Sequence, residues 1–183
     1  MISAGASHLR HLIYELLGPN GCRIYADRTG VSRNTVIRAL NDRNASLART
    51  LDLVFSLYLE ARNLGCDPAQ LLATRRDPPA SLLPPMVRYL GQDAVSLLAD
   101  RLSRTQRAVM DGLMRPSAKL WQHFDVMMAP LASITSGGGS VTTAFNRRIE
   151  PRPVQDLMVV PLASQRAAPF SVMGQGAFAP GMV

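Results

Sequence analysis

Apolar residues recur three or four positions apart through most of the chain from Met1 to Thr135. This spacing places them on one face of an α-helix and therefore predicts helices. Glycine, proline and asparagine interrupt the pattern after residues 17, 29, 41 and 64, where turns are expected. Between Met1 and Arg76 the predicted helices span residues 7–17, 22–29, 33–41, 45–64 and 68–72.

Four prolines lie between residues 77 and 85, and each lacks a backbone donor and disfavours helix in the residue before it. The segment 77–85 is therefore predicted to be a linker. Helical spacing resumes at Met86 and predicts a helix over residues 93–114 and a second over 117–128. Two such helices would pack as a hairpin, so residues 86–135 are predicted to form a dimerisation or partner-binding module.

From residue 136 onward the chain is rich in glycine, proline and small residues, beginning with Ser-Gly-Gly-Gly-Ser at 136–140. This composition predicts a largely flexible tail over 136–183. Residues 154–162 are the exception, since their apolar run would suit a strand or docking onto a partner. The predicted fold class is all-α: a five-helix domain (1–76), a linker, a helical hairpin and the tail.

The stretch from Ala26 to Asp42 predicts two helices joined by a tight turn. Gly30 suits the turn because a residue that ends a helix and reverses the chain favours a positive φ, which glycine adopts without a clash. Ser32 is expected to cap the next helix through its hydroxyl. Val36 and Leu40 then face inward, four residues apart.

The opposite side of this helix carries Arg33, Asn34 and Arg38. Arginine binds guanine O6 and N7 with two hydrogen bonds, and asparagine binds adenine N6 and N7 in the same way. The three side chains are therefore predicted to contact bases in the DNA major groove. The predicted phosphate contacts are Arg23, Ser32, Thr35 and Arg43. The plain alternative is a small helical hairpin whose arginine face is merely solvated.

The run Gly-Val-Ser-Arg-Asn-Thr-Val-Ile-Arg-Ala-Leu-Asn at residues 30–41 resembles the helix-turn-helix of the Cro and phage-repressor (XRE) class. Arg-Asn-Ala-Ser-Leu at 43–47 and Leu-Gly-Cys-Asp-Pro at 64–68 resemble the fourth and fifth helices of that class, so the likeness spans about residues 7–73. It implies a five-helix DNA-binding domain. Arg23 would replace the phosphate-binding glutamine that phage repressors often carry at the position of Cys22. A likeness to the lactose-repressor headpiece stops at Asp42.

The charge distribution agrees with a nucleic-acid partner. The chain has a net charge of +7 and a pI near 10.4. The stretch from Met1 to Arg76 holds ten arginines and six acidic residues, a net +4, so over half of the excess lies with the predicted reading helix. Arginine bias also follows from GC-rich coding, and the charge alone is weak support.

Other site classes lack the residues that they need. Cys22 and Cys66 form neither a disulfide framework nor a metal cluster, and His8 and His11 lack further ligands, so no metal or cofactor is predicted. There is no lysine-bearing phosphate loop, activated nucleophile or spaced carboxylate pair, which argues against an enzyme. Without a signal sequence or an apolar run of ~20 residues, we expect a cytoplasmic protein that does not enter membranes.

An apolar stripe beyond the linker is predicted to be the contact of a homodimer, because a two-fold dimer reads two half-sites one DNA turn apart. Its members are Val95, Leu98, Leu102, Val109 and Leu113. Ordinary intramolecular core is the alternative for this stripe. Trp121, Met127 and Met128 would equally line a ligand pocket.

The sequence thus predicts a dimeric, sequence-specific transcriptional regulator that binds double-stranded DNA, of the kind found in phages and mobile elements. The alternative is a DNA-anchored adaptor whose C-terminal half recruits a protein partner, as in replication, partition or recombination complexes. A third, structural alternative is a helical protein that never meets DNA.

Overall fold

The structure is a computed structural model that describes residues 4–41, 43–74, 80–115, 118 and 120–146. In this part of the chain every regular element is an α-helix, so the all-α prediction is confirmed for it. None of these helices is long and apolar enough to cross a membrane. The predicted strand or docking segment at 154–162 lies outside the described residues. The helices are α1 (Ala4–Leu17), α2 (Gly21–Thr29), α3 (Arg33–Leu40), α4 (Ala45–Asn63), α5 (Pro68–Ala73), α6 (Leu83–Leu90), α7 (Ala94–Leu102), α8 (Gln106–Met114), α9 (Trp121–Ser136) and α10 (Val141–Asn146).

The five helices predicted between Met1 and Arg76 are confirmed, and the largest shift of an end is at α1, which begins at Ala4 and not at residue 7. Side-chain caps fix three of the starts. The side chains of Ser32, Asn44 and Asp67 accept hydrogen bonds from backbone N–H groups in the first turns of α3, α4 and α5. Pro68 occupies the first turn of α5, where its missing N–H would have no helical partner.

The single helix predicted over residues 93–114 is wrong. Helix α7 ends at Leu102, and Ser103 takes the left-handed conformation with a φ of 49°. Thr105 then caps α8, because its Oγ1 accepts a hydrogen bond of 3.2 Å from the N–H of Ala108. The apolar spacing continues across the break because both helices face the same core, and this concealed the turn.

Other predicted boundaries moved as well. Helix α6 begins inside the predicted linker 77–85, at Leu83, with two prolines in its first turn. Helix α9 extends beyond the predicted end at 128, to Ser136, and contains Pro130 in its interior. Helix α10 begins at Val141, in the segment predicted to be flexible. Composition predicted a linker at 77–85 and a flexible segment from residue 136. The structure instead places two prolines of the linker in the first turn of α6, and α10 within the glycine-rich segment.

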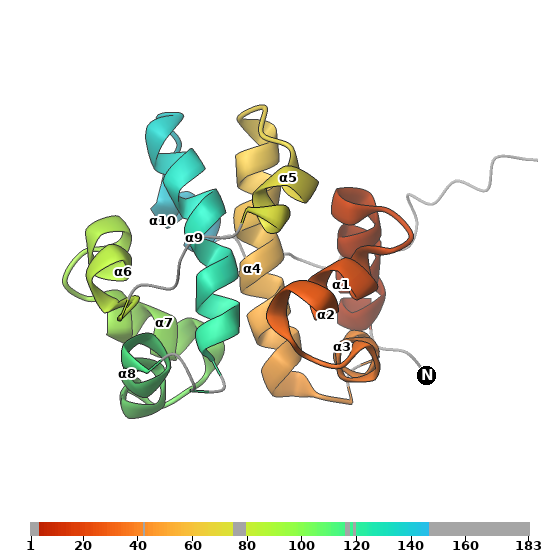
Figure 1. Cartoon of the computed structure of the whole chain (residues 1–183), viewed down its shortest axis with the longest axis horizontal. Coiled ribbons are helices and arrows are strands. Elements are labelled where there is room, and N and C mark those ends of the chain that lie inside the picture. The colour runs from red at the N-terminus through yellow and green to blue at the C-terminus, as the bar shows by residue number, and fades with distance from the viewer. Residues whose placement is uncertain (1–3, 42, 75–79, 116–117, 119, 147–183) are drawn as a thin grey trace, which may run out of the picture. The chain divides into compact units, whose positions relative to one another are not determined.

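Helices α4 and α9 form the centre of the fold. Figure 1 shows them side by side and running in the same direction, with α1 to α3 beside α4 and α6 to α8 beside α9. Phe55, Leu57 and Tyr58 on α4 and Phe124 and Met127 on α9 are buried. One continuous hydrophobic core includes residues from both sides of the proline-rich segment. The two predicted modules therefore share a core, and each large side chain buried in it contributes about 1.5–3 kcal/mol.

The order of elements in α6–α10 repeats that in α1–α5. Each series begins with two helices that are separated by a glycine with positive φ. A left-handed residue and a capping hydroxyl then lead into the third helix. A long central helix, another glycine with positive φ and a short last helix complete the series. The corresponding turn residues are Gly18 and Gly91, Gly30 and Ser103, Ser32 and Thr105, and Gly65 and Gly138.

Candidate nucleic-acid interface

A rigid turn sets the orientation of α3. Gly30 ends α2 in the left-handed conformation, with a φ of 69°. The Oγ of Ser32 then accepts a hydrogen bond of 3.2 Å from the N–H of Thr35. Val36 is fully buried and Leu40 nearly so, which directs the inner side of α3 into the core. The rotation of α3 is therefore fixed by a glycine, a cap and two core residues.

The three predicted base-reading residues share the outer side of α3. Arg33, Asn34 and Arg38 are all exposed, and at 100° per residue they span an arc of about 140°. Among the described residues, none of the three makes a side-chain hydrogen bond or ion pair. Their donors and acceptors face solvent, as a base-reading helix requires.

The predicted phosphate contacts lie at the two ends of α3 and, for Arg23, on α2. Arg23, Ser32 and Arg43 are exposed, and Thr35 is half-buried. The hydroxyls of Ser32 and Thr35 lie 2.7 Å apart and share one hydrogen bond. One of the two hydroxyl protons is therefore left to donate to an outside acceptor such as a phosphate oxygen.

Arg10 is a further basic residue of this surface, and we did not predict it. Its guanidinium donates to Oδ1 of Asn41, the residue that follows α3. Burial raises the pKa of the Cys22 thiol, while the positive charges of Arg33 and Arg10 oppose the rise, which places both arginines near the start of α2. Only the packing of α1 against α3 brings Arg10 to this surface.

Arg104 reaches the same surface from the turn between α7 and α8. Its guanidinium donates to Oγ of Ser46 in the first turn of α4. With Thr35, Gln122 and His123 it also lines a pocket of about 300 Å³. The predicted phosphate-binding hydroxyl and Arg104 are therefore neighbours, although they belong to different halves of the chain. Sequence spacing gave no signal of this contact.

Two polar contacts attach α2 to α9. The hydroxyl of Tyr25 lies 2.6 Å from Nδ1 of His123, and both side chains are buried. Burial raises the pKa of Tyr25, while burial and the charge of Arg104 lower the pKa of His123 to about 4, so both groups are neutral near pH 7. Arg28 forms an ion pair of 2.6 Å with Asp125 and donates to the carbonyl of Leu72 at 3.1 Å.

The predicted dimer stripe lies within the chain's own core. Leu98, Leu102, Val109 and Leu113 are buried there, and Val95 packs half-buried against it. A second copy of the chain does not reach the four buried side chains while this core is closed. The homodimer stays a prediction, and its contact has to use other residues.

Two alternative site types have no support in the described part of the chain. Trp121, Met127 and Met128, considered for a ligand pocket, are buried core residues. No group of three or more histidine, cysteine, aspartate or glutamate side chains among the described residues is placed to hold a metal ion.

No protein-family model matches the chain, and neither does any curated protein or solved structure.

Proposed function

We propose that the chain binds double-stranded DNA sequence-specifically and regulates transcription, with α3 as the helix that reads bases in the major groove. The observation that carries this proposal is the exposed arc of Arg33, Asn34 and Arg38, held by the Gly30 turn and the Ser32 cap. Two guanidinium groups and an amide are the side-chain groups that pair bidentately with guanine and adenine.

The surroundings of α3 support a polyanionic partner. Arg10 and Arg43 add positive charge next to the end of α3, Arg23 adds another on the neighbouring α2, and α3 itself contains no acidic residue. Such charges supply the salt-dependent, sequence-independent part of DNA affinity. A purely structural helical protein gives no reason for this concentration of arginines around one short helix.

The likeness of residues 7–73 to the Cro and phage-repressor class points to a regulator of a promoter. The homodimer is not carried into this proposal, because most of its predicted contact residues are core residues. The adaptor alternative keeps the same DNA-binding helix, so it differs in what the bound protein does and not in how α3 binds.

Base reading by α3 is tested with duplexes selected by the full-length protein from a random pool. Arg33→Ala or Arg38→Ala is expected to weaken binding to the selected site by roughly 1–3 kcal/mol and to change binding to random DNA little. Arg88→Ala is the matched control, since Arg88 is an exposed arginine on α6. Equal losses on both DNAs would remove the base-reading role from α3.

Phosphate contact is tested by salt titration of the same complexes. Arg43→Ala and Arg23→Ala are each expected to weaken binding on every sequence and to lower the slope of log K against log salt by about one, because each arginine releases condensed counterions. If the salt slope of a variant equals that of Arg88→Ala, the arginine replaced in that variant does not contact phosphate.

A further inference from the structure

Residues 82–146, here the C-terminal repeat, correspond to residues 9–73, the N-terminal repeat, without insertion or deletion. All four pairs of turn residues described above are 73 positions apart, and the same register aligns identical residues. The identical pairs include buried residues in or directly before matching helices: Leu9 and Leu82, Ala26 and Ala99, Val36 and Val109, Leu40 and Leu113, and Leu47 and Leu120. Matching turn geometry, caps and core positions show that one structural unit occurs twice in the chain.

The two repeats contact each other reciprocally. Arg28 on α2 pairs with Asp125 on α9, and Arg101 on α7 pairs with Asp52 on α4. In the repeat register Arg28 corresponds to Arg101 and Asp52 to Asp125. Contacts in which residue i meets j and j meets i define a two-fold, self-complementary interface. The repeats therefore pack as the two subunits of a symmetric dimer do, within a single chain.

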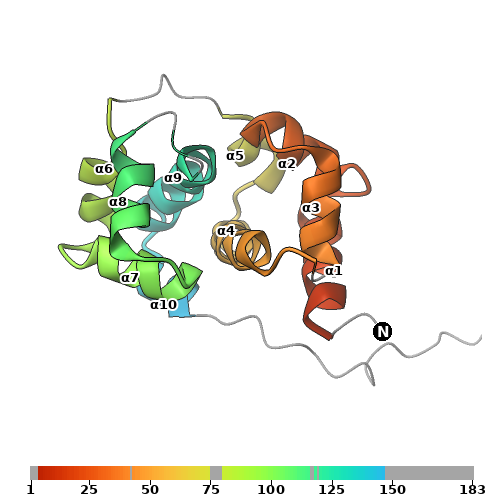
Figure 2. The ribbon, with the colours of Figure 1, turned by 90° about the horizontal axis from the view of Figure 1, so that it is seen from below.

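This symmetry places α3 and α8 at one end of the repeats. The central helices α4 and α9 run in the same direction, so the two-fold axis lies along them and leaves corresponding helices at the same end (Figure 1). Figure 2 shows this end, with α3 and α8 on either side of the starts of α4 and α9. At 8–10 Å per helix contact, three contacts from α3 through α4 and α9 to α8 span about 24–30 Å. The upper end of that span approaches one DNA turn of about 34 Å, the separation of two adjacent half-sites.

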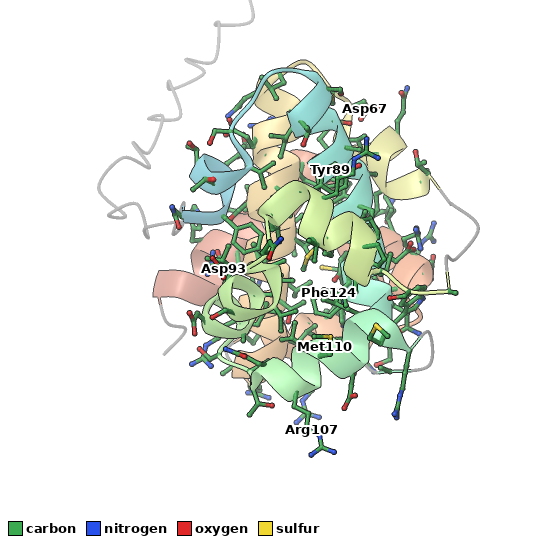
Figure 3. The ribbon with its side chains drawn as sticks, turned by 90° about the vertical axis from the view of Figure 1, so that its left-hand side faces the viewer. Asp67, Tyr89, Asp93, Arg107, Met110 and Phe124 are labelled. Carbon is green, nitrogen blue, oxygen red and sulfur yellow. The ribbon has the colours of Figure 1, made fainter. Side chains whose placement is uncertain are left out.

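The outer side of α8 carries side chains of the types that read bases. Gln106 and Arg107 occupy the positions of Arg33 and Asn34, and both are exposed. Glutamine reads adenine and arginine reads guanine by bidentate hydrogen bonds. Figure 3 shows Arg107 projecting from the end of the molecule. Arg104, in the turn before α8, adds a positive charge between the two candidate reading helices.

We propose that α8 is a second DNA-reading helix, so that one chain binds two adjacent half-sites of different sequence. The proposal rests on the proposed function, because it assigns to the C-terminal repeat the role given to α3. The half-sites differ because Gln106, Arg107 and Asp111 stand where α3 has Arg33, Asn34 and Arg38. The chain supplies internally the second reading helix that a homodimer would otherwise provide.

A protein partner is the other occupant that α8 would suit. Met110 and Met114 are 37% and 47% exposed, and exposed apolar side chains mark some protein interfaces. DNA is favoured because α8 shares its face with α3 and because the repeats are equally basic. The N-terminal repeat has eight arginines and six acids, and the C-terminal repeat has five arginines, one lysine and four acids, a net +2 in each.

The test uses the full chain and duplexes of about 40 base pairs selected from a random pool. The bound site is expected to show two unlike clusters of specified bases, centred about 10 base pairs apart, with one chain per duplex in sedimentation. Gln106→Ala and Arg107→Ala are each expected to weaken binding roughly 10-fold and to relax base preference in one cluster only, while Arg33→Ala relaxes the other. Arg88→Ala is the matched control, and circular dichroism verifies that each variant is folded.

Inserting about 5 base pairs between the clusters turns one half-site to the opposite face of the duplex, so binding is expected to fall at least 10-fold. The inference is overturned if the Arg107→Ala protein binds like Arg88→Ala, or if two chains bind per site and α3 reads both clusters. Arg33→Ala would still weaken binding in either case, so the proposed function would stand and the exposed methionines would point to a protein partner. If no duplex is selected, or Arg33→Ala has no effect, the proposed function itself fails.

Discussion

The two repeats share a backbone plan and differ in the outward side chains of their third helices, α3 and α8. In α3 the outer side holds two arginines and an asparagine, whereas in α8 it holds Gln106, Arg107 and Asp111, with two methionines beside them. Inward positions changed less, since Val36 and Leu40 recur as Val109 and Leu113. Core residues fix the orientation of the helix, so the outer residues can vary without changing that orientation. The comparison shows one scaffold that presents two outer surfaces of different side-chain chemistry.

The interface between the repeats is symmetric in plan and unequal in detail. The hydroxyl of Tyr25 contacts His123, but of the corresponding residues Leu98 has no polar side-chain group and Thr50 donates its hydroxyl to the carbonyl of Ser46. Tyr58 donates to the carbonyl of Val126 at 2.9 Å, and its counterpart in the C-terminal repeat is Leu131. The N-terminal repeat therefore supplies both tyrosine hydroxyls of the interface, so corresponding substitutions in the two repeats should have unequal effects.

The largest inequality is expected for the two ion pairs. Arg28→Ala should lower the free energy of unfolding by about 3–4 kcal/mol, because it leaves Asp125, 14% exposed, without its partner. Arg101→Ala should cost less, about 1–2 kcal/mol, because Asp52 is 27% exposed and better solvated. Urea unfolding of both variants measures the difference. The Arg28→Ala, Asp125→Ala double variant should recover part of the loss, and equal losses for the two single variants would contradict the assigned inequality.

An intermediate effect is expected from His123, whose counterpart is Thr50. The pKa of His123 is about 4 in the folded protein, against 6.5 ordinarily, so only the unfolded chain binds the proton between these values. Stability should therefore fall as the pH is lowered from about 6.5 to 4, by up to about 3 kcal/mol from this residue, and this contribution is intact above pH 6.5.

His123→Gln keeps an acceptor for the hydroxyl of Tyr25 and removes the titrating ring. Unfolding measured from pH 7 to 4 should give a smaller acid-induced loss for this variant than for the unchanged protein. Carboxylates contribute equally in both proteins, so the difference between the two curves isolates His123. Parallel curves would mean that folding does not lower the pKa of His123, because the ring would then take up its proton equally in the folded and unfolded states.

The smallest effect is expected at the two left-handed turn residues. Ser103→Gly should raise the free energy of unfolding by about 1 kcal/mol, because glycine adopts a φ of 49° without the clash of a Cβ. Gly30→Ser should lower it by a similar amount. An added Cβ at residue 30 would meet only Nε2 of Gln122, at 3.5 Å, so the cost is that of the backbone.

Ser96→Gly serves as the control, since a glycine inside α7 should destabilise by about 0.5–1 kcal/mol. Thermal unfolding of the three variants gives the signs. A loss of stability in Ser103→Gly would contradict the comparison of the two turns.

Local signals predicted the N-terminal repeat well and the C-terminal repeat poorly. In the former, glycine and a capping serine mark the turn before α3, and apolar periodicity stops between the helices. In the latter, serine occupies the left-handed position and apolar residues continue across the turn, so the spacing predicted one long helix. Arg104 and Arg10 were missed as basic neighbours of α3 because no local pattern relates them to it.

The sequence by itself determined the helical class, the first five helices and which side of α3 faces outward, because caps, glycines and apolar spacing act within a few residues. Only the tertiary structure decided that the second apolar stripe is core and that α9 packs along α4. It also decided that Arg28 and Arg101 exchange aspartates across the repeats. These outcomes depend on which apolar faces bury each other over long separations, and a local pattern gives a face its hydrophobicity without specifying its partner.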